Sequence, residues 1–596
     1  MLRNYSGSRR RESALIPSPR RRPDTVMVAE DGSHARLTSA PARVGGYLNR
    51  YFVAILFTVL IVLQAACAEW QWAVAVKNEK PANGPARAWL WIPPNCERVR
   101  GIVVAQHNME EISILENPKF RRALADLNFA EVWAAPPFDH LFRFNQGAGD
   151  TFNGMMNDLA EASGYDELKF APVAPMGHSA AASWPYYFAA WNPERTLAAL
   201  SVSGQWPYYR NKDFAPDIWG DRNIDSVPCL ESMGEYESAD AWSREGLLER
   251  RNHPHIPLSM LANPAQGHFA STDKKAEYLA LYLKKSVEYR VPGDWDATSP
   301  PKLIPIDPAK TGWLADKWHL NLEPSSLAAP VGQYQGDPNE AFWFFDERLA
   351  KATEEYESEY RGLKPQLLGY VQDGKMVAQR DSHLQVDLRF EPETDGLSFH
   401  LSGAFYDFVP TGSPRLPGWT GLPVGSALGH AANTNAISID RICGPFEKTL
   451  PGTFAVRFQK ETLLNTNARQ YELVFALTHP GDAQCKAAVQ QAHMFIPARN
   501  KLGSEQRITF PPIPGQRLAT KSVKLKAKSD SGMPVHYFVR EGPADMEVDV
   551  LRFLPIPPRA KFPVKVTVIA WQYGRSTEPG VQTAEPVEQA ILIIGR

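Results

Sequence analysis

Cysteine, net charge and cofactor motifs are what this 596-residue sequence has least of. Five cysteines exclude a dense disulfide framework, and the lack of a C-x-x-C pair argues against a structural zinc site. The near balance of 64 basic and 66 acidic residues excludes a broadly basic nucleic-acid binder. The sequence has no P-loop, H-E-x-x-H, calcium-loop pattern or glycine-rich dinucleotide fingerprint, so no metal or other cofactor is implied.

Apolar and aromatic residues, by contrast, are plentiful. Hydrophobic residues make up 44% of the chain and there are 16 tryptophans, which is enough to build buried cores and excludes a disordered chain. At about 100–200 residues per domain, the length predicts three or four domains. The 50 prolines favour loops and β modules over an all-helical protein.

Residues 1–68 are predicted to be a leader and not part of the fold. Arginine runs precede a short apolar stretch over 51–63, which is followed by Ala66-Cys67-Ala68. A basic flank, a short apolar core and a small-x-small site predict a secretory signal peptide that is cleaved after Ala68. The apolar stretch is shorter than the roughly 20 residues of a transmembrane anchor. Polar Gln64 argues against a lipoprotein attached through Cys67.

Cleavage would leave 528 residues with 54 basic and 62 acidic side chains, a net charge of −8. The basic leader is therefore no evidence for a nucleic-acid partner. We expect a protein that is secreted, periplasmic or on the cell surface, with no stable membrane insertion after signal cleavage. Export permits disulfides, and Cys443 and Cys485 could form one.

Residues 69–290 alternate short apolar runs with amphipathic, helix-like stretches. This alternation predicts an α/β fold with a mainly parallel eight-stranded sheet flanked by helices. The expected strands are Trp70–Val76, Ala88–Ile92, Gly101–Gln106, Glu131–Ala135, Phe170–Met176, Leu197–Ser203, Val227–Met233 and Pro257–Ala262. The expected helices include Pro118–Leu127, Phe152–Ala162 and Lys274–Lys285.

Beyond residue 290 the pattern changes twice. Residues 291–365 are interpreted as an extension packed on the sheet or as a linker, with a helix over Ala341–Tyr360. In 366–504 apolar residues recur with a period of two, as at Leu397, Phe399 and Leu401, which predicts a β-rich domain. Residues 505–596 read as short strands separated by turns, which predicts a β-sandwich module. The C-terminal domains are thus expected to be all-β.

One motif in the α/β region indicates chemistry. The apolar stretch Ala171–Pro175 leads into Gly177-His178-Ser179-Ala180-Ala181, and a helix-like stretch follows. A strand, a sharp turn that carries a serine and then a helix make up a nucleophile elbow. Small neighbours, here Gly177 and Ala181, leave room for the strained turn. The simpler alternative is a serine that caps a helix after a core strand.

A nucleophilic serine needs a histidine as base and a carboxylate as acid. In a fold with this order of strands and helices, the three residues follow along the chain as Ser, acid, His. His268 comes after the last strand and is the predicted base, while His253 and His255 precede that strand. The acid is expected after Val227–Met233. Spacing favours Glu237, with Glu235 as the rival and Asp240 as a third choice.

An oxyanion hole requires two backbone N–H groups. One is expected from Ala180, directly after the serine, and the other from the loop that follows the third strand. There we predict the Met109 amide, with Asn108 as the alternative. His107 is interpreted as structural, and the neighbours Glu110 and Glu111 either contact substrate or are solvated loop charges.

Two aromatic clusters lie near these motifs. Trp184, Tyr186 and Tyr187 fall on the helix after Ser179, and Trp206, Tyr208 and Tyr209 follow the sixth strand. Because loops at the carboxyl ends of strands line the pocket in such folds, Trp206 and Tyr208 are the candidate substrate contacts. Ordinary packing under loops is the alternative.

Over residues 70–290 these motifs resemble the α/β-hydrolase superfamily in order and spacing. The general layout is similar to secreted bacterial esterases of the poly(hydroxyalkanoate) depolymerase, feruloyl esterase and acetylxylan esterase kinds. The final module, with Ser529–Val535 and Glu541–Ala544, is similar to Ig-like repeats of bacterial surface proteins. The resemblance implies a metal-free serine hydrolase. The departures are Ala181 for glycine, a glutamate as acid and Asn108 in the oxyanion loop.

The leading hypothesis is a secreted serine hydrolase that cleaves carboxylic esters through an acyl-enzyme with a Ser-His-Glu triad. Its expected partner is an ester substrate, carried by a polysaccharide or another polymer. The alternatives are a serine peptidase on the same fold and a catalytically inactive hydrolase-fold protein that binds surfaces.

Overall fold

The computed structural model describes residues 70–77, 85–208, 219–380, 385–411, 416–460, 462 and 471–595. The chain divides into two compact units, Met1–Leu63 and Gln64–Arg596, and every described residue belongs to the second. The predicted leader with its cleavage site, and Tyr209, lie outside the described residues. Within the described ranges, no helix has both the length and the apolar character that a membrane crossing requires.

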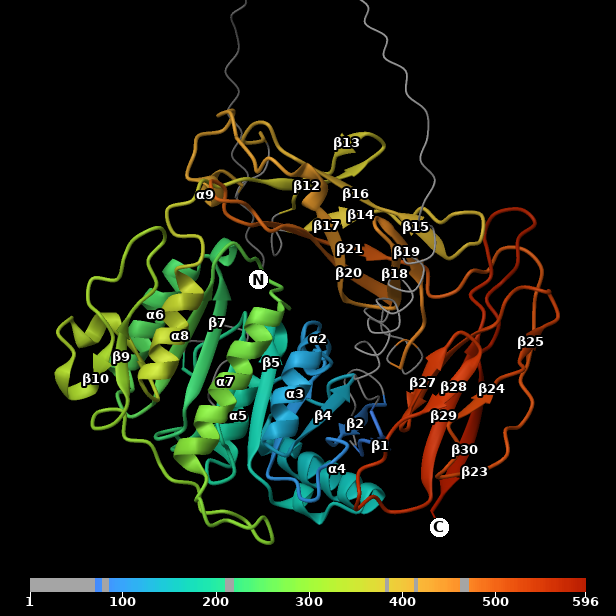
Figure 1. Ribbon diagram of the computed structural model, residues 1–596, viewed down its shortest axis with the longest axis horizontal. Helices are drawn as coiled ribbons and strands as arrows, with labels where there is room; N and C mark the ends of the chain where they lie inside the picture. Colours follow the sequence, from blue (N-terminus) through green and yellow to red (C-terminus); the bar gives the residue numbers. More distant parts are fainter. Residues whose placement is uncertain are drawn as a thin grey trace, which may run out of the picture. The chain divides into compact units, whose positions relative to one another are not determined.

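The first part of the described chain folds around an eight-stranded, mostly parallel sheet (Figure 1), as predicted. The strand order is β1-β2-β4-β3-β5-β6-β7-β8. Strands β1 and β2 run antiparallel to their neighbours, and all pairs from β4 to β8 are parallel. The bounds are Trp72–Ala75, Arg87–Trp91, Gly101–Gln106, Phe129–Ala135, Val173–His178, Ala199–Val202, Cys229–Gly234 and Leu258–Asn263.

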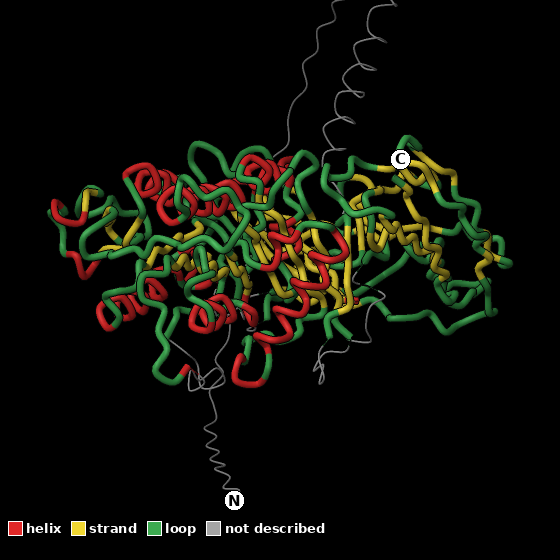
Figure 2. The backbone as a smooth tube through the Cα atoms, turned by 90° about the horizontal axis from the view of Figure 1, so that it is seen from below, coloured by secondary structure: helices red, strands yellow, loops and turns green. Residues whose placement is uncertain are grey.

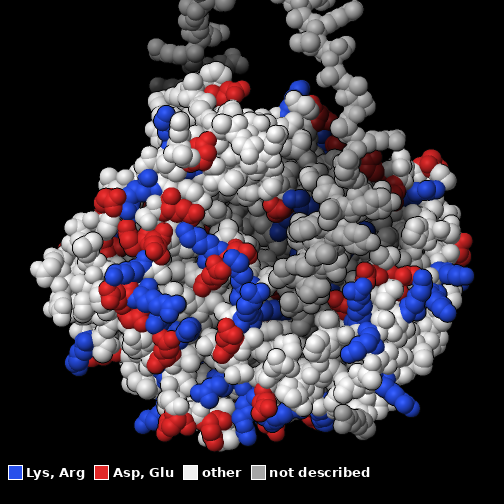
Figure 3. All heavy atoms as spheres, in the orientation of Figure 1, with Lys and Arg blue, Asp and Glu red and all other residues white. Residues whose placement is uncertain are grey.

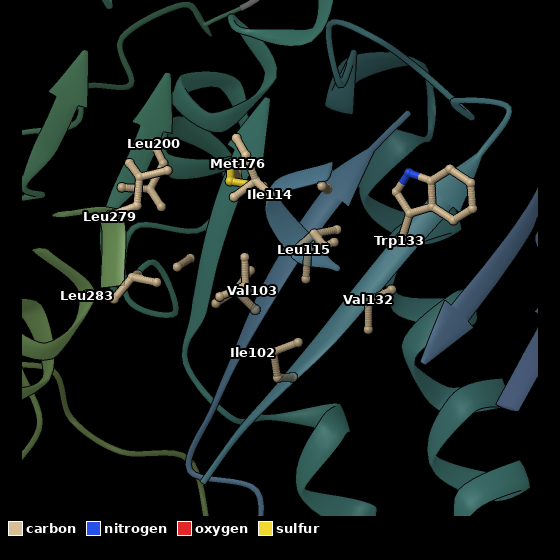
Figure 4. Packing of buried hydrophobic residues seen from close by; sticks show 14 of the residues in the cluster. Ile102, Val103, Ile114, Leu115, Val132, Trp133, Met176, Leu200, Leu279 and Leu283 are labelled. Atoms are coloured by element: carbon tan, nitrogen blue, oxygen red, sulfur yellow. The ribbon is translucent and has the colours of Figure 1, made fainter. Parts of the chain in front are cut away.

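The central strands are continuous apolar runs because both faces of the sheet are covered. Every residue of β3, β4 and β5 is buried. Figure 4 shows buried side chains of β3 to β6 together with side chains of the covering helices α2 and α7, which belong to the same core. The labelled residues are Ile102, Val103, Val132, Trp133, Met176 and Leu200 on the strands, and Ile114, Leu115, Leu279 and Leu283 on the helices.

The helices lie on both faces of the sheet (Figure 2), as the handedness of parallel crossovers requires. The step from β3 to β4 and the step from β4 to β5 run in opposite directions across the sheet, so right-handed connections put α3 and α4 on opposite faces. Helix α3 packs beside α7, and α5 follows β5. The bounds are Glu111–Leu115 for α2, Pro118–Asp126 for α3, Ala148–Ser163 for α4, Trp184–Trp191 for α5, Ala239–Asn252 for α6 and Asp273–Arg290 for α7.

The segment after α7 forms a small sheet, β10-β9-β11, and a helix, α8, that pack against β8. The Oγ of Ser259 donates to the Trp343 carbonyl at 2.5 Å, and the Ala262 N–H donates to Glu357 Oε1 at 2.8 Å. The predicted helix over Ala341–Tyr360 is wrong in its first residues. Ala341–Phe344 is a buried strand, because its aromatic side chains pack inward, and the helix begins only after Asp346 caps it. The bounds are Trp313–Asp316 (β9), Ala329–Pro330 (β10), Ala341–Phe344 (β11) and Glu347–Glu357 (α8).

The C-terminal region consists mainly of β strands in small sheets. In the first part, the sheets are β13-β12-β16, β14-β21-β20-β17 and β15-β19-β18, with a short helix α9 over Leu416–Thr420. Their strands are Leu368–Gln372 (β12), Lys375–Met376 (β13), Val386–Leu388 (β14), Ser398–His400 (β15), Ser402–Phe405 (β16), Ser438–Cys443 (β17), Phe446–Leu450 (β18), Thr453–Val456 (β19), Glu472–His479 (β20) and Ala488–Phe495 (β21).

The last part of the chain has the sheets β22-β25, β23-β30-β29-β26 and β24-β28-β27. Their strands are Ile508–Thr509 (β22), Gln516–Arg517 (β23), Ser522–Lys524 (β24), Lys528–Ser529 (β25), His536–Glu541 (β26), Ala544–Glu547 (β27), Val550–Phe553 (β28), Val564–Trp571 (β29) and Val587–Ile594 (β30).

No cysteine of the described chain is in a disulfide, and each is buried, which corrects the suggested disulfide between Cys443 and Cys485. Cys443 ends β17 and pairs in register with Val474, whereas the Cys485 backbone is held in a turn by the Asp482 carboxylate. Cys485 lies in the loop between β20 and β21.

Basic and acidic side chains are interspersed on the face drawn in Figure 3. The described chain has exposed ion pairs, such as Lys274 with Glu359 and Arg389 with Glu391. Such pairs contribute little to stability individually, because both charges remain largely solvated.

Candidate active site

Ser179 lies in a strained turn at the carboxyl end of β5. Its φ is +55°, a left-handed conformation that is uncommon for residues other than glycine. The 3-10 turn Ser179–Ala181 follows directly, and α5 begins at Trp184. A Cβ on Gly177 would lie only 2.0 Å from the Ala181 carbonyl oxygen, so the turn requires glycine at that position. The geometry is that of a nucleophile elbow.

His268 lies in the loop after β8, and its imidazole meets a carboxylate. Its Nδ1 is 2.8 Å from Glu237 Oε2, and both side chains are largely buried, at 5% and 14% exposure. Glu237 ends the short turn Glu235–Glu237 that follows β7. A carboxylate at Nδ1 favours the tautomer with the proton on Nδ1, which leaves Nε2 able to accept a proton.

The residue before Ser179 links the serine turn to the His268 loop. The His178 ring lies 4.6 Å from the His268 ring, centroid to centroid, and its Nε2 is 3.0 Å from the His268 carbonyl oxygen. His178 is completely buried. The structure thus brings the turn after β5, the turn after β7 and the loop after β8 to one edge of the sheet.

The rival acids have other partners. Glu235 Oε2 accepts a hydrogen bond from the Ala265 N–H at 2.8 Å, and its Oε1 forms an ion pair with Lys486. Both of these side chains are buried, at 7% and 4% exposure. Asp240 is 45% exposed and pairs with Arg244 on α6. Glu235 therefore joins the turn Glu235–Glu237, called the acid loop below, to neighbouring backbone and to the β-rich region.

The loop after β3 corrects the predicted second oxyanion donor. The Met109 N–H donates to Glu111 Oε2 at 2.8 Å, and the Asn108 N–H donates to the same oxygen at 2.9 Å. Both amides are therefore occupied by a carboxylate, which contradicts Met109 and its alternative Asn108 as oxyanion donors in this conformation. Ala180, half-buried at the start of the turn, stays a prediction.

Glu110 and Glu111 are neither solvated loop charges nor exposed to substrate, because both are 0% exposed. Burial raises the pKa of Glu111 to about 7, against the lowering effect of the backbone N–H groups that it accepts. Glu110 Oε1 accepts hydrogen bonds from the Ala270 N–H and the Ser271 Oγ, each at 3.0 Å. The sequence did not predict these buried hydrogen bonds, because the residue types alone do not show that the two side chains point into the fold.

The predicted substrate contact Trp206 is wrong, because its side chain is completely buried. Its Nε1 donates to the Trp242 carbonyl at 3.0 Å, and its ring stacks on Phe342. Trp184, Tyr186 and Tyr187 on α5 are core residues as well. Tyr208 is half-buried and stacks on His253 with a centroid distance of 3.7 Å, so its contact with substrate stays a prediction. His255 is exposed.

A cavity of about 480 Å³ borders the acid loop. Its wall combines aromatic, aliphatic and charged side chains from three separate segments. Trp419 of α9 stacks on Tyr236 at 4.3 Å and donates its Nε1–H to the Tyr236 carbonyl at 3.1 Å. Because Trp318 and Trp419 come from segments far along the chain, no local pattern points to this cavity. The lining includes Tyr236, Ser238, Asp240, Arg244, Trp318, Leu320 and Trp419.

Two side chains of the β-rich region reach the loops of the site. Gln491 of β21 donates to the Phe269 carbonyl, and its Oε1 accepts from the Phe269 N–H at 3.2 Å. A Cβ on Gly267 would lie 2.9 Å from that same oxygen. With the ion pair between Lys486 and Glu235, both the acid loop and the His268 loop are held from this side.

Among the described residues, no group of three or more His, Cys, Asp or Glu side chains is placed to hold a metal ion. The elbow and the order of strands are those of an α/β-hydrolase-like domain.

Comparisons with known proteins give only remote structural likeness. Neither the known family models nor the curated proteins match this sequence. Solved structures that are similar include a dienelactone hydrolase from Anabaena variabilis, with 16% identity, 37% of this chain and 98% of that chain covered, and a TM-score of 0.26. Est1E from Butyrivibrio proteoclasticus has 15% identity, 36% and 96% coverage and a TM-score of 0.24. An S-formylglutathione hydrolase from Agrobacterium tumefaciens has 12% identity, 36% and 94% coverage and a TM-score of 0.28.

Proposed function

We propose that this protein is a serine hydrolase that cleaves carboxylic esters through an acyl-enzyme. The observation that carries the proposal is the 2.8 Å contact between His268 Nδ1 and Glu237 Oε2. It is supported by Ser179, held at a φ of +55°, which directly follows His178, whose ring lies 4.6 Å from the His268 ring. The three residues follow the carboxyl ends of β5, β7 and β8, where a parallel sheet presents its catalytic groups. Their chain order, Ser-Glu-His, is that of α/β-hydrolases.

In the proposed reaction, Ser179 Oγ attacks the ester carbonyl while His268 Nε2 takes the hydroxyl proton. Glu237 holds the imidazole and stabilises the imidazolium. The Ala180 N–H, at the start of the turn, donates to the developing oxyanion. The tetrahedral intermediate collapses, the C–O bond to the alcohol breaks, and His268 gives the proton to the leaving oxygen. Water then repeats both steps on the acyl-enzyme and releases the carboxylic acid.

The cavity beside the acid loop supports a substrate with a ring-containing, polar alcohol or acyl part, as in a polysaccharide-linked ester. The indole of Trp419 offers a face for ring stacking, and the Asp240–Arg244 pair offers an acceptor and donors for hydroxyl groups. We propose that this cavity takes over the role that the sequence suggested for Trp206.

We also propose that the protein is exported. The leader over 1–68 would be removed, and the enzyme would act on polymers in the periplasm, at the cell surface or outside the cell. N-terminal sequencing of exported protein is expected to begin at Glu69, and recovery of an intact N-terminus would contradict cleavage after Ala68.

The test of the enzymatic proposal is labelling and hydrolysis with a matched serine variant. A fluorophosphonate probe is expected to label Ser179, and the purified chain is expected to hydrolyse a short-chain nitrophenyl ester. Ser179→Ala should abolish labelling and lower the rate by roughly 10³–10⁶-fold without unfolding the protein. A wild-type chain that neither labels nor hydrolyses would support the inactive surface-binding alternative, and faster cleavage of peptide amides than of esters would support the peptidase.

A second assay addresses the substrate class. Acetylated, feruloylated and polyester substrates are compared with wild type and Trp419→Ala. If the cavity binds the ring-containing part, Trp419→Ala raises KM for a polysaccharide-linked ester and leaves nitrophenyl acetate hydrolysis unchanged. An equal effect on both substrates would reject this binding role.

A further inference from the structure

Two consecutive glutamates, Glu110 and Glu111, lie at the start of α2 with no exposure to solvent. Burying one carboxylate costs free energy unless hydrogen bonds and charges compensate it, and here two are buried side by side. Hydrophobic side chains would fill the same space at a lower cost. The partners of the two carboxylates therefore indicate what they are for.

Glu111 connects the loop after β3 with the serine turn. Its Oε2 accepts the N–H groups of Asn108 and Met109, and its Oε1 accepts the His178 N–H at 2.8 Å. One carboxylate thus accepts backbone donors from both loops. The Asn108 side chain reinforces the link, because its Nδ2 donates to the His178 carbonyl at 3.1 Å. His178 directly precedes the nucleophilic serine of the proposed reaction.

Glu110 connects the same start of α2 with the loop that carries His268. Its Oε1 accepts from the Ala270 N–H and the Ser271 Oγ, and the Lys275 Nζ lies 3.4 Å away as a buried countercharge. Its Oε2 is 3.3 Å from His178 Nε2. Ala270 is two residues beyond His268, so the position of the imidazole depends on this contact.

We propose that Glu110 and Glu111 are positioning residues that hold the three loops of the site, after β3, β5 and β8, in one geometry. The inference rests on the proposed function, because it assigns the held loops to an ester-cleaving site. Neither carboxylate touches the reacting atoms in this role. They act through the backbone of His178 and Ala270, which fixes the separation of the Ser179 hydroxyl from the His268 ring.

The isosteric change Glu111→Gln tests this with almost no change in volume. An amide has one acceptor oxygen and one NH2 group, and both carboxylate oxygens of Glu111 face N–H donors. In either orientation, the glutamine NH2 opposes a backbone N–H of one of the two loops. The link is therefore broken on one side while the cavity stays filled.

The matched control is Glu357→Gln. Glu357 is a buried glutamate, 9% exposed, whose Oε1 accepts a single backbone N–H, from Ala262, at 2.8 Å. One amide oxygen can take over that bond. Glu357 lies on α8, outside the three loops, so its variant reports the effect of replacing a buried carboxylate by an amide elsewhere in the fold.

The measurements are kcat and KM for a nitrophenyl ester, and amide hydrogen exchange by mass spectrometry. For Glu111→Gln we expect kcat to fall about 100-fold, because a misplacement of roughly 1 Å costs that much, with KM within about threefold. Exchange should rise in the segments around 107–111 and 177–181. Glu110→Gln should raise exchange around 268–272 and lower kcat. Glu357→Gln should change neither kcat nor these segments.

Unchanged kcat together with unchanged exchange in both segments of Glu111→Gln would overturn the inference. A uniform rise in exchange over the whole chain would overturn it too, because it would indicate general destabilisation. If the wild type neither labels nor hydrolyses, the proposed function fails, and the local pattern of exchange still decides whether the two glutamates hold the loops.

Discussion

The contact between His268 and Glu237 makes a sharp prediction for the variant Glu237→Gln. Glutamine keeps the shape and an acceptor oxygen but loses the charge that stabilises the imidazolium. If its NH2 group turns toward Nδ1, the imidazole must carry its proton on Nε2 and can no longer accept one from Ser179. From the 2.8 Å separation and the low exposure of both side chains, we expect kcat to fall by about 10²–10⁴-fold, or roughly 3–5 kcal/mol in the barrier.

The comparison variant is Glu235→Gln, two residues earlier in the same turn. Glu235 pairs with Lys486, whose side chain is 4% exposed, so its loss leaves a buried charge without its partner. Removing one member of a buried pair costs about 3–5 kcal/mol of unfolding free energy. We expect Glu235→Gln to lower stability strongly and kcat mildly, and Glu237→Gln to do the reverse.

The assay measures kcat, KM and the urea midpoint of both variants with one nitrophenyl ester. KM of Glu237→Gln should stay within about threefold of wild type, because the carboxylate does not bind substrate. A large loss of kcat in Glu235→Gln with full activity in Glu237→Gln would refute the assignment of Glu237, whatever its distance from His268.

Three further outcomes follow from other parts of the structure. Gly177→Ala places a Cβ 2.0 Å from the Ala181 carbonyl oxygen, so the turn must move; thermal melting and fluorophosphonate labelling should both fall, and unaltered labelling would contradict the tight turn. Trp206→Ala empties a completely buried site and should cost about 3–5 kcal/mol of unfolding free energy, whereas a change in KM alone would restore it as a substrate contact. Because the pKa of Glu111 is raised from 4.5 to about 7 in the folded state, this carboxyl holds a proton between pH 4.5 and 7 that it has released in the unfolded chain. The contribution of Glu111 to the unfolding free energy should therefore fall by about 3 kcal/mol as pH rises through this window, and urea titrations at pH 5 and 8 should show a smaller change in Glu111→Gln than in wild type.

The sheet was predictable from the sequence because each of its strands is marked by the residue types within the strand itself. Strands that are covered on both faces must be continuous apolar runs, and such runs mark all eight strands within a few residues. The turn at Ser179 was predictable for a similar reason, because the strand, the serine with its small neighbours and the helix follow one another directly in the sequence.

The contacts that could not be predicted from the sequence depend on the directions that side chains take in the folded chain. Glu111 bends back to its own loop and takes the amides of Asn108 and Met109, a direction that no pattern of residue types encodes. Trp206 was predicted to contact substrate because it follows the sixth strand, but the ring of Phe342, more than 100 residues along the chain, stacks on its indole. At Ala341–Phe344, pairing with β9 outweighs the helical pattern.

The two hydrogen bonds between the Gln491 side chain and the Phe269 backbone have a consequence for how this chain can be divided. A primary amide that both donates to and accepts from one residue imitates an adjacent β-strand, so β21 supplies the loop of the proposed base with a neighbour that the α/β part over residues 70–290 lacks. A shortened chain that ends before β21 would leave the Phe269 N–H and carbonyl to water, directly beside His268. The α/β part over residues 70–290 is therefore a poor candidate for transplantation into another protein, and insertions or fusions that alter β21 should be judged by their effect on the proposed activity as well as on folding.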